Sequence, residues 1–295
     1  MESKGLLVIP DDVSTNAAPP IVREYAMRIA TFITACVVAA AVPVYASEEA
    51  EGPTLAEVIA SPGRASDAVR DPYRHPAETL EFFGIEPTMS VVEYGPGGGW
   101  YTKVLYPWIA PHGRYMALQG DTGPLAEGQT PWAVRFKARA VADWGMEADK
   151  ITAFESDEIP EELLGTVDRV LIFRSLHGMM EGTTASRELR VIRALLADDG
   201  MVGIVQHRAP ENAPYSYTNG SMGYLRQTDV ISLFELNGFK LVAASEINAN
   251  PDDPADWPDG VWTLPPSLDL GEQDRERYMA IGESDRMTLL FRKRD

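Results

Sequence analysis

Short apolar runs recur along the chain and predict buried β-strands. The runs at 89–94 (MSVVEY), 167–173 (VDRVLIF) and 201–206 (MVGIVQ) are almost continuously apolar, which is typical of strands covered on both faces. Two shorter β-prone runs lie at 115–118 and 150–154. Helical patterns separate and flank these runs, at 53–60, 66–69, 76–83, 100–109, 185–196 and 229–237. The alternation predicts one α/β domain with a doubly wound, mostly parallel sheet.

The C-terminal part of the chain departs from this alternation. Residues 239–247 and 287–292 both have strand character, and a long Pro-rich stretch separates them without a helical pattern. We therefore expect an antiparallel pair of strands at this end of the sheet, joined by a loop without a helix. Within it, residues 248–266 are either a functional loop or a surface meander.

The segment that starts at Met27 has the pattern of a secretory signal. One arginine precedes an uncharged run from Ile29 to Val44, and small residues at Val44 and Ala46 suit signal peptidase. We expect cleavage after Ala46, so residues 1–46 form an extension with a signal peptide, and 47–295 form the domain with an N-terminal helical lid. This predicts a periplasmic or secreted protein without a stable membrane anchor after cleavage. A retained anchor and a cytoplasmic location are the alternatives.

Charge and cysteine content narrow the function further. The formal net charge is −18, and no Lys/Arg cluster with interleaved aromatic residues interrupts it, so nucleic acid is a poor candidate substrate. Cys36, the only cysteine, lies in the apolar run of the signal, which excludes a disulfide within the mature chain. The four histidines lack the local spacing of a metal site, so no metal is expected.

The most specific local motif is the glycine-rich turn at 93–99 (EYGPGGG), between an expected strand and an expected helix. Glycines let the backbone turn sharply and let a ligand lie against it. A nicotinamide-dinucleotide fingerprint requires a third glycine where this chain has Trp100, so the oxidoreductase interpretation is disfavoured. The spacing acidic-x-Gly-x-Gly-x-Gly fits an S-adenosylmethionine site better. A tight turn with a purely structural role is the alternative.

Four longer stretches resemble a family of exported or periplasmic class I methyltransferases. They are YRHPAETLEFFGI at 73–85, VVEYGPGGGWYTKVL at 91–105, EINANPDDPADWPDGVWTLPP at 246–266 and IGESDRMTLLFRK at 281–293. The resemblance runs from about Leu55 to the C-terminus and implies a Rossmann-like fold that binds S-adenosylmethionine.

The resemblance also implies roles for individual residues. Those expected to contact the cofactor are Glu93, Gly95, Gly97, Gly99, Tyr101, Asp121 and His75. Glu93 and the three glycines would line the methionine end, and Asp121 would accept hydrogen bonds from the ribose. Gln119 also occupies a candidate ribose position, where the family has an acidic residue. His75 would contact the cofactor from the lid, or else cap the next helix.

Polar residues that follow the fourth and fifth strands are candidates for catalysis. Parallel sheets bind ligands beyond the carboxyl ends of their strands, where Arg174, His177 and His207 are expected. A histidine could remove the proton of a methyl acceptor. The Glu283–Arg286 turn is expected to be a salt-bridged support, or else part of the pocket, and Trp257 and Trp262 either wall an apolar acceptor site or form a satellite core.

The sequence therefore predicts methyl transfer from S-adenosylmethionine to a small molecule. A non-catalytic ligand-binding or scaffold protein on the same fold is the alternative, because the family's residues at the ribose and acceptor positions are partly replaced here.

Overall fold

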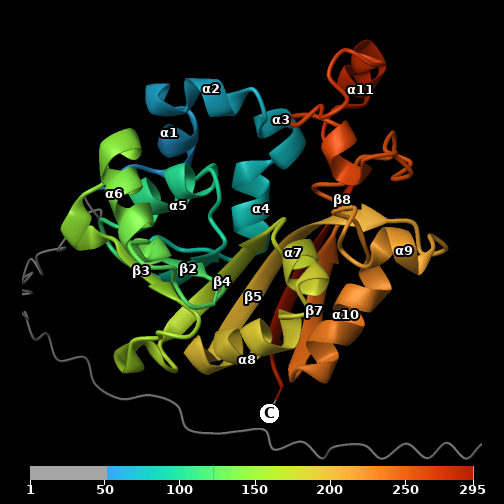
Figure 1. Ribbon diagram of the computed structural model, residues 1–295. Coiled ribbons are helices and arrows are strands. Elements are labelled where there is room, and N and C mark those ends of the chain that lie inside the picture. The colour runs from blue at the N-terminus through green and yellow to red at the C-terminus, as the bar shows by residue number, and fades with distance from the viewer. Residues whose placement is uncertain (1–51, 122, 295) are drawn as a thin grey trace, which may run out of the picture. The chain divides into compact units, whose positions relative to one another are not determined.

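The sheet follows the strand order β3-β2-β1-β4-β5-β8-β7, with the short β6 paired to β5 (Figure 1). The computed structural model describes residues 52–121 and 123–294; the expected signal peptide and cleavage site lie outside them. All pairs are parallel except those of β8, which runs antiparallel to both β5 and β7. The strands are β1 Ser90–Tyr94, β2 Arg114–Gln119, β3 Thr152–Glu155, β4 Val167–Phe173, β5 Leu196–Ala209, β6 Leu225–Arg226, β7 Phe239–Ser245 and β8 Arg286–Lys293. The expected Rossmann-like fold, a mostly parallel sheet with a C-terminal antiparallel pair, is confirmed.

Helices cover both faces of this sheet. They are α1 Leu55–Ile59, α2 Ala65–Ala68, α3 Asp71–Arg74, α4 Pro76–Phe82, α5 Thr102–Ile109, α6 Trp132–Trp144, α7 Leu176–Glu181, α8 Ala185–Leu195, α9 Tyr215–Thr218, α10 Gln227–Leu236 and α11 Arg275–Ile281. Four 3₁₀ turns supplement them, η1 Pro62–Arg64, η2 Ala148–Lys150, η3 Glu161–Leu163 and η4 Gly260–Thr263. None of the helices in the described ranges is long and apolar enough to cross a membrane.

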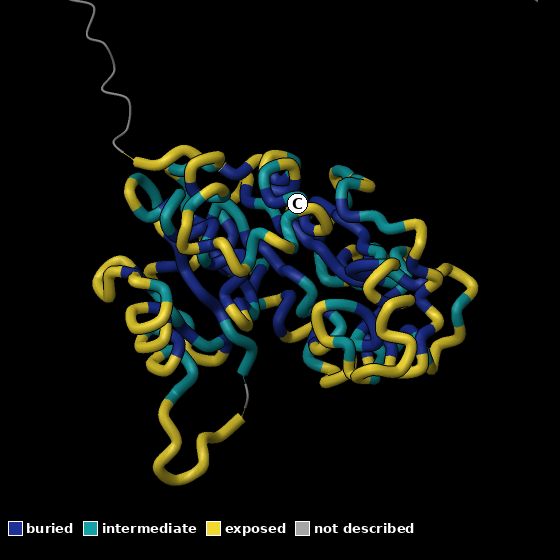
Figure 2. Tube along the Cα trace, turned by 90° about the horizontal axis from the view of Figure 1, so that it is seen from above, coloured by how far each residue is buried: buried dark blue, intermediate teal, exposed yellow. Residues whose placement is uncertain are grey.

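Two hydrophobic cores result, one on each face, because successive strand residues point to opposite sides. Val92 and Ile172 pack with α7, α8 and α10, whereas Val91 and Leu171 pack with α4, α5 and α6. Both neighbours in each strand are fully buried, which explains why β1 and β4 are apolar without alternation. Figure 2 shows these buried segments running through the interior, with the exposed segments around them.

The connection between β7 and β8 contains a helix, so the expectation of a loop without one is wrong. Helix α11 buries Tyr278, which meets Trp257 edge to face with ring centroids 5.5 Å apart. These two residues belong to a third apolar cluster, under the long connection. A helix of about two turns gives little periodic signal, and its tertiary contact decides its conformation.

Candidate functional site

The turn after β1 has a backbone that requires glycine. Gly95, Gly97 and Gly99 have φ angles of 61°, 53° and 76°, in the left-handed region that favours glycine. A Cβ atom on Gly99 would lie 2.4 Å from the Trp144 ring, and one on Gly95 would lie 2.8 Å from Ser175 Oγ. The turn thus packs closely against Trp144 at Gly99 and against Ser175 at Gly95, which leaves no room for a side chain at either position.

A cavity of about 330 Å³, here called the glycine-loop cavity, lies over this turn. Residues 95–98 form one side, together with Glu93 from β1 and Tyr101 at the start of α5. The N-terminal helices contribute Arg70 and Arg74, and the end of β4 contributes Arg174. Five of the expected site residues, Glu93, Gly95, Gly97, Tyr101 and Arg174, therefore line one cavity, whereas Gly99 shapes the turn against Trp144.

Glu93 is a buried carboxyl group held by two hydroxyl donors. Thr102 Oγ1 donates to Glu93 Oε2 at 2.6 Å, and Tyr115 Oη donates to the same oxygen at 2.7 Å. Burial raises the pKa of Glu93 to about 7, although both hydrogen bonds oppose this shift. The group is therefore close to half protonated at neutral pH.

Tyr101 connects the glycine turn to the N-terminal helices. Its ring stacks on Phe173 with centroids 3.5 Å apart, and its hydroxyl donates to the Arg74 carbonyl oxygen at 3.2 Å. Burial raises the Tyr101 pKa to about 12, so the hydroxyl remains a donor. Tyr101 thereby fixes Arg74 against the cavity.

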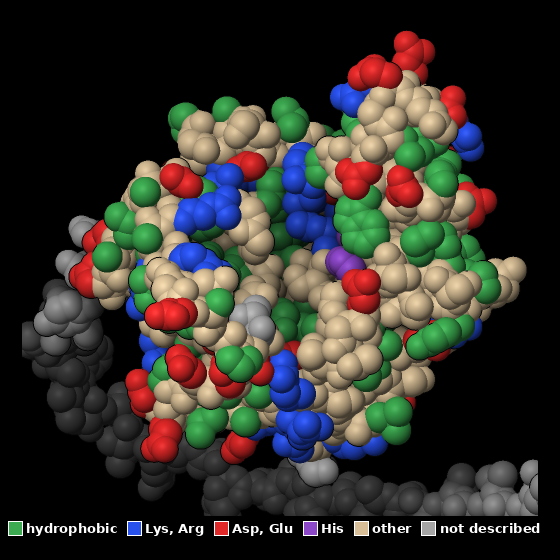
Figure 3. Space-filling model, in the orientation of Figure 1, with side chains coloured by type: hydrophobic (Ala, Val, Ile, Leu, Met, Phe, Trp, Pro, Cys, Tyr) green, Lys and Arg blue, Asp and Glu red, His purple; other side chains and the backbone are tan. Residues whose placement is uncertain are grey.

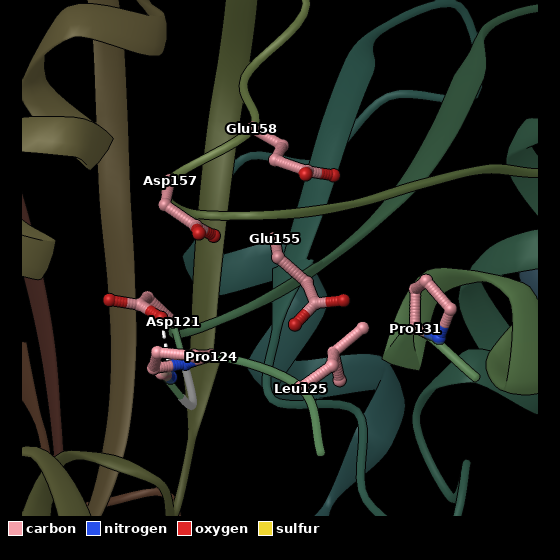
Figure 4. A pocket seen from close by; sticks show the side chains of 8 residues that line it. Asp121, Pro124, Leu125, Pro131, Glu155, Asp157 and Glu158 are labelled. Carbon is pink, nitrogen blue, oxygen red and sulfur yellow. Dashed lines mark hydrogen bonds between the residues drawn. The ribbon is translucent and has the colours of Figure 1, made fainter. Parts of the chain in front are cut away.

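A second cavity, the acidic cavity, of about 370 Å³, lies where β2 and β3 end. Asp121, Glu155, Asp157 and Glu158 line it, and Figure 4 shows their side chains with Leu125 and Pro131 on the side of Glu155. Asp121 already has protein partners, because Oδ2 accepts from Arg187 Nη1 at 2.8 Å and Oδ1 accepts from the Gly123 amide at 2.6 Å. Glu155, which the sequence did not single out, accepts from the Trp132 amide at 2.9 Å through Oε1.

A third cavity, the histidine cavity, of about 200 Å³, contains His177 and His207. The centroids of their rings are 5.8 Å apart, and the Trp262 ring centroid lies 5.9 Å from that of His177. Arg70, Arg74 and Arg174 line this cavity as well as the glycine-loop cavity, so the two spaces adjoin. The three arginines lie at their junction.

The two histidines have different hydrogen-bond partners. Gln206 Nε2 donates to the Gly223 carbonyl oxygen at 2.8 Å and approaches His177 Nδ1 at 3.5 Å. His207 Nδ1 lies 2.6 Å from Ser284 Oγ. Burial lowers the pKa of His177 below its usual value and that of His207 well below it, so both rings are neutral at pH 7.

An arginine cluster, comprising Arg70, Arg74, Arg174 and Arg286, borders the junction. Glu283 accepts from three of them, namely Arg70 Nε at 2.6 Å, Arg74 Nε at 2.9 Å and Arg286 Nη1 at 3.0 Å. The Glu283 turn is thus both a salt-bridged support and part of the pocket wall. Figure 3 shows Lys and Arg side chains gathered around the central hollow of this face, with a histidine beside them.

Of the other candidates from the sequence, His75 and Trp257 lie outside these cavities. His75 has a φ of 40° between α3 and α4, makes no capping hydrogen bond through its side chain, and is not among the residues that line the three cavities. Trp257 belongs to the third apolar cluster, whereas Trp262 walls the histidine cavity. Within residues 52–121 and 123–294, no cluster of His, Cys, Asp and Glu could hold a metal ion.

The sequence did not reveal Arg70, Arg74 and Gln206. Arginines in short N-terminal helices usually face solvent, and a glutamine inside a buried strand has no motif to mark it. Gln206 does carry a weak signal, because a polar residue in an apolar strand that is fully buried needs partners.

Comparison with known proteins gives structural likenesses only. No family model matches the chain, and no curated protein does. The chain is similar to a SAM dependent methyltransferase from Aquifex aeolicus, at 16% identity over 66% of this chain and 94% of that one, with a TM-score of 0.47. It is similar to the 1,6-didemethyltoxoflavin-N1-methyltransferase of Burkholderia thailandensis, solved with 1,6-didemethyltoxoflavin and S-adenosylhomocysteine, at 15% identity over 79% and 83%, with a TM-score of 0.45. It is also similar to the [4+2]-cyclase SpnF, at 15% identity over 81% and 91%, with a TM-score of 0.49. The likeness to these proteins is one of fold.

Proposed function

We propose that this protein transfers a methyl group from S-adenosylmethionine to a small molecule. The observation that carries the proposal is the pair of adjoining cavities, one over a turn whose backbone favours glycine and one that contains two neutral histidines. S-adenosylmethionine would supply an electrophilic methyl carbon: the acceptor's electron pair forms the new bond, the carbon–sulfur bond leaves its pair on sulfur, and the acceptor's proton passes to the protein.

The residues that are present fit this cofactor. The left-handed turn at 95–99 leaves open backbone where a ligand can approach, and Glu93 is close enough to the turn to accept from an ammonium group. The carboxylates of the acidic cavity suit hydroxyl and amine donors, such as those of a ribose and an adenine. Asp121 could accept a hydrogen bond from the ribose only if it gave up part of its contact with Arg187.

The two histidines would have different roles toward the methyl acceptor, one as a hydrogen-bond donor and the other as the base that accepts its proton. The donor that Gln206 presents to His177 Nδ1 favours the tautomer with its proton on Nε2, so His177 would donate a hydrogen bond to the acceptor. Ser284 Oγ can accept from His207 Nδ1, which leaves His207 Nε2 free to accept the acceptor's proton. Trp262 would hold the acceptor between the two rings and the arginines.

Calorimetric titration of the purified full-length chain tests the cofactor site. We expect saturable binding of S-adenosylmethionine and S-adenosylhomocysteine, and none of NAD. Gly98→Leu should abolish this binding. Gly98 lines the cavity, has no positive φ, and has nothing within 4 Å of an added Cβ. The leucine side chain therefore causes no backbone strain, and it occupies the space that the ligand needs.

Gly63→Leu is the matched control, since Gly63 has the same freedom outside the three cavities. A folded protein that binds neither sulfur compound would contradict the proposal. Binding without turnover of any acceptor would instead favour the non-catalytic ligand-binding protein.

We also propose that the chain is exported through the signal at 27–46. The apolar run and the small residues before Ser47 support this. N-terminal sequencing of the protein from a periplasmic fraction should give Ser47 as the first residue. Recovery of the uncleaved chain from the cytoplasm would contradict it and would leave the protein in the compartment where the cofactor is made.

A further inference from the structure

The arginine cluster carries more positive charge than the protein neutralises. Arg70, Arg74 and Arg286 share the single carboxylate of Glu283, and Arg174 has no ion pair among the described residues. Four guanidinium groups therefore face one carboxylate. Burial and the neighbouring Arg286 lower the Arg174 pKa to about 10, which still leaves the group charged at neutral pH.

Other acidic groups of the glycine-loop cavity supply only part of the missing charge, although Glu93 is close enough to Arg174 for their charges to attract. Asp67 forms an ion pair with Lys103. Glu93 is held by Thr102 and Tyr115, and its raised pKa leaves it only partly ionised at pH 7. A buried charge without a partner is strongly destabilising, so the excess positive charge of the cluster favours the binding of an anion.

Two donors at the junction have no acceptor within residues 52–121 and 123–294. Arg74 has only 3% of its side chain exposed, and its Nη1 is buried without a hydrogen bond. Arg174 Nη1 is likewise buried without a partner. Both arginines line both cavities. Most buried polar side-chain atoms have a hydrogen-bond partner, so two unsatisfied guanidinium donors that line the same pair of cavities mark a place for an acceptor oxygen. Arg64 Nε is also buried without a partner, but Arg64 lines neither cavity.

We propose that the methyl acceptor is a small oxyanion, a carboxylate or phosphate, whose charged group binds to Arg74 and Arg174 at the junction of the two cavities. This inference rests on the proposed function and names the substrate class of the same site. The acceptor's body lies in the histidine cavity against Trp262, in a space of about 200 Å³. That volume admits a single ring with a short substituent.

The charge of the cofactor supports an anionic acceptor. A sulfonium is a cation, and bringing it next to several guanidinium groups is unfavourable unless an anion lies between them. An oxyanion at Arg74 and Arg174 removes this repulsion, so cofactor and acceptor bind cooperatively. The carboxylate of the cofactor's own methionine part has the same chemistry, and the test below separates the two sources.

The test titrates the full-length chain, saturated with S-adenosylhomocysteine, with benzoate, phenyl phosphate and neutral benzamide. The anions should bind about tenfold more tightly than benzamide, because a charge-assisted hydrogen bond lost in a buried site has at least this effect. Arg174→Met should abolish the preference while changing S-adenosylhomocysteine affinity by less than about threefold.

Arg174→Met should also leave the unfolding temperature unchanged or raised, since it removes an unpaired buried charge and keeps most of the side-chain volume. An arginine with a purely structural role would lower it. Arg190→Met is the control, because Arg190 is exposed on α8 and lines none of the three cavities, and it should keep the preference for anions.

Two outcomes would overturn the inference. One is equal binding of anions and benzamide, or no binding of either. The other is an Arg174→Met variant that no longer binds S-adenosylhomocysteine but still binds 5′-methylthioadenosine, which lacks the carboxylate. That result would show that the arginine cluster binds the carboxylate of the cofactor and not the acceptor. If the sulfur compounds fail to bind, the proposed function fails, and the same comparison of anions with benzamide on the unloaded chain decides only whether the two arginines bind an oxyanion.

Discussion

Glu93 shows how a single buried group sets a local pH dependence. Its pKa is raised from 4.5 to about 7 by burial, so the folded state keeps a proton that the unfolded chain releases between these values. Its contribution to the free energy of unfolding is therefore fully present below pH 4.5 and is lost as the pH rises to 7. At about 1.4 kcal/mol per pKa unit, the loss is about 3 kcal/mol.

Glu93→Gln should remove this pH-dependent loss. The amide oxygen can still accept from Thr102 and Tyr115, and it does not ionise. Urea unfolding between pH 4.5 and 7.5 should show a flatter profile for the variant. Glu57→Gln is the control, because hydrogen bonds from Thr54 lower the pKa of that exposed carboxyl and give it the opposite slope. An unchanged profile in Glu93→Gln would show that Glu93 ionises normally.

At the scale of elements, the glycine turn and helix α7 make opposite use of glycine. Gly178 lies inside α7, is exposed, and has nothing within 4 Å of an added Cβ. Gly178→Ala should therefore raise the free energy of unfolding by about 0.5–1 kcal/mol, through the lower entropy of the unfolded chain.

Gly99→Ala should lower the free energy of unfolding by about 1–3 kcal/mol. The change adds a positive-φ penalty to an overlap with the Trp144 ring. Gly98→Ala, in the same turn but without either problem, is the matched control for thermal unfolding. Equal unfolding temperatures for the two variants would show that the turn relaxes around a side chain.

The elements also show which parts of the structure a sequence can reveal. Strands β1, β4 and β5 were predictable because both faces of each are covered, which leaves an unbroken apolar run. Helix α6 was missed because only Phe136 and Ala140 are buried along its 13 residues, so its apolar stripe is weak. The segment before β3 therefore gave no periodic signal.

The site is less predictable than the fold because its contacts span the whole molecule. The turn at 93–99 is local, and its role as a cavity wall follows from its own glycines. Glu283, by contrast, meets Arg70 and Arg74 across 213 and 209 positions of sequence. No local sequence pattern encodes these contacts. The antiparallel pairing of β8 with β5 is what brings the Glu283 turn, which precedes β8, to the N-terminal helices.

The pH dependence of turnover depends on the whole molecule, because the fold buries the proposed base, His207. Burial, the neighbouring His177 and the positive charges of Arg286 and Arg174 lower the His207 pKa well below 6.5. The neutral ring that accepts a proton is thus present at pH 7 and is lost only as the pH falls through this lowered value. At saturating S-adenosylmethionine, where the ionisation of Glu93 near pH 7 does not limit cofactor binding, kcat/KM for the acceptor should therefore be level from pH 7 to 8 and fall only below the usual histidine range. His207→Gln should reduce kcat by about 10²–10⁴-fold and abolish the acidic limb, with S-adenosylhomocysteine affinity retained. Loss of activity with the limb unchanged would instead assign the titrating group to His177.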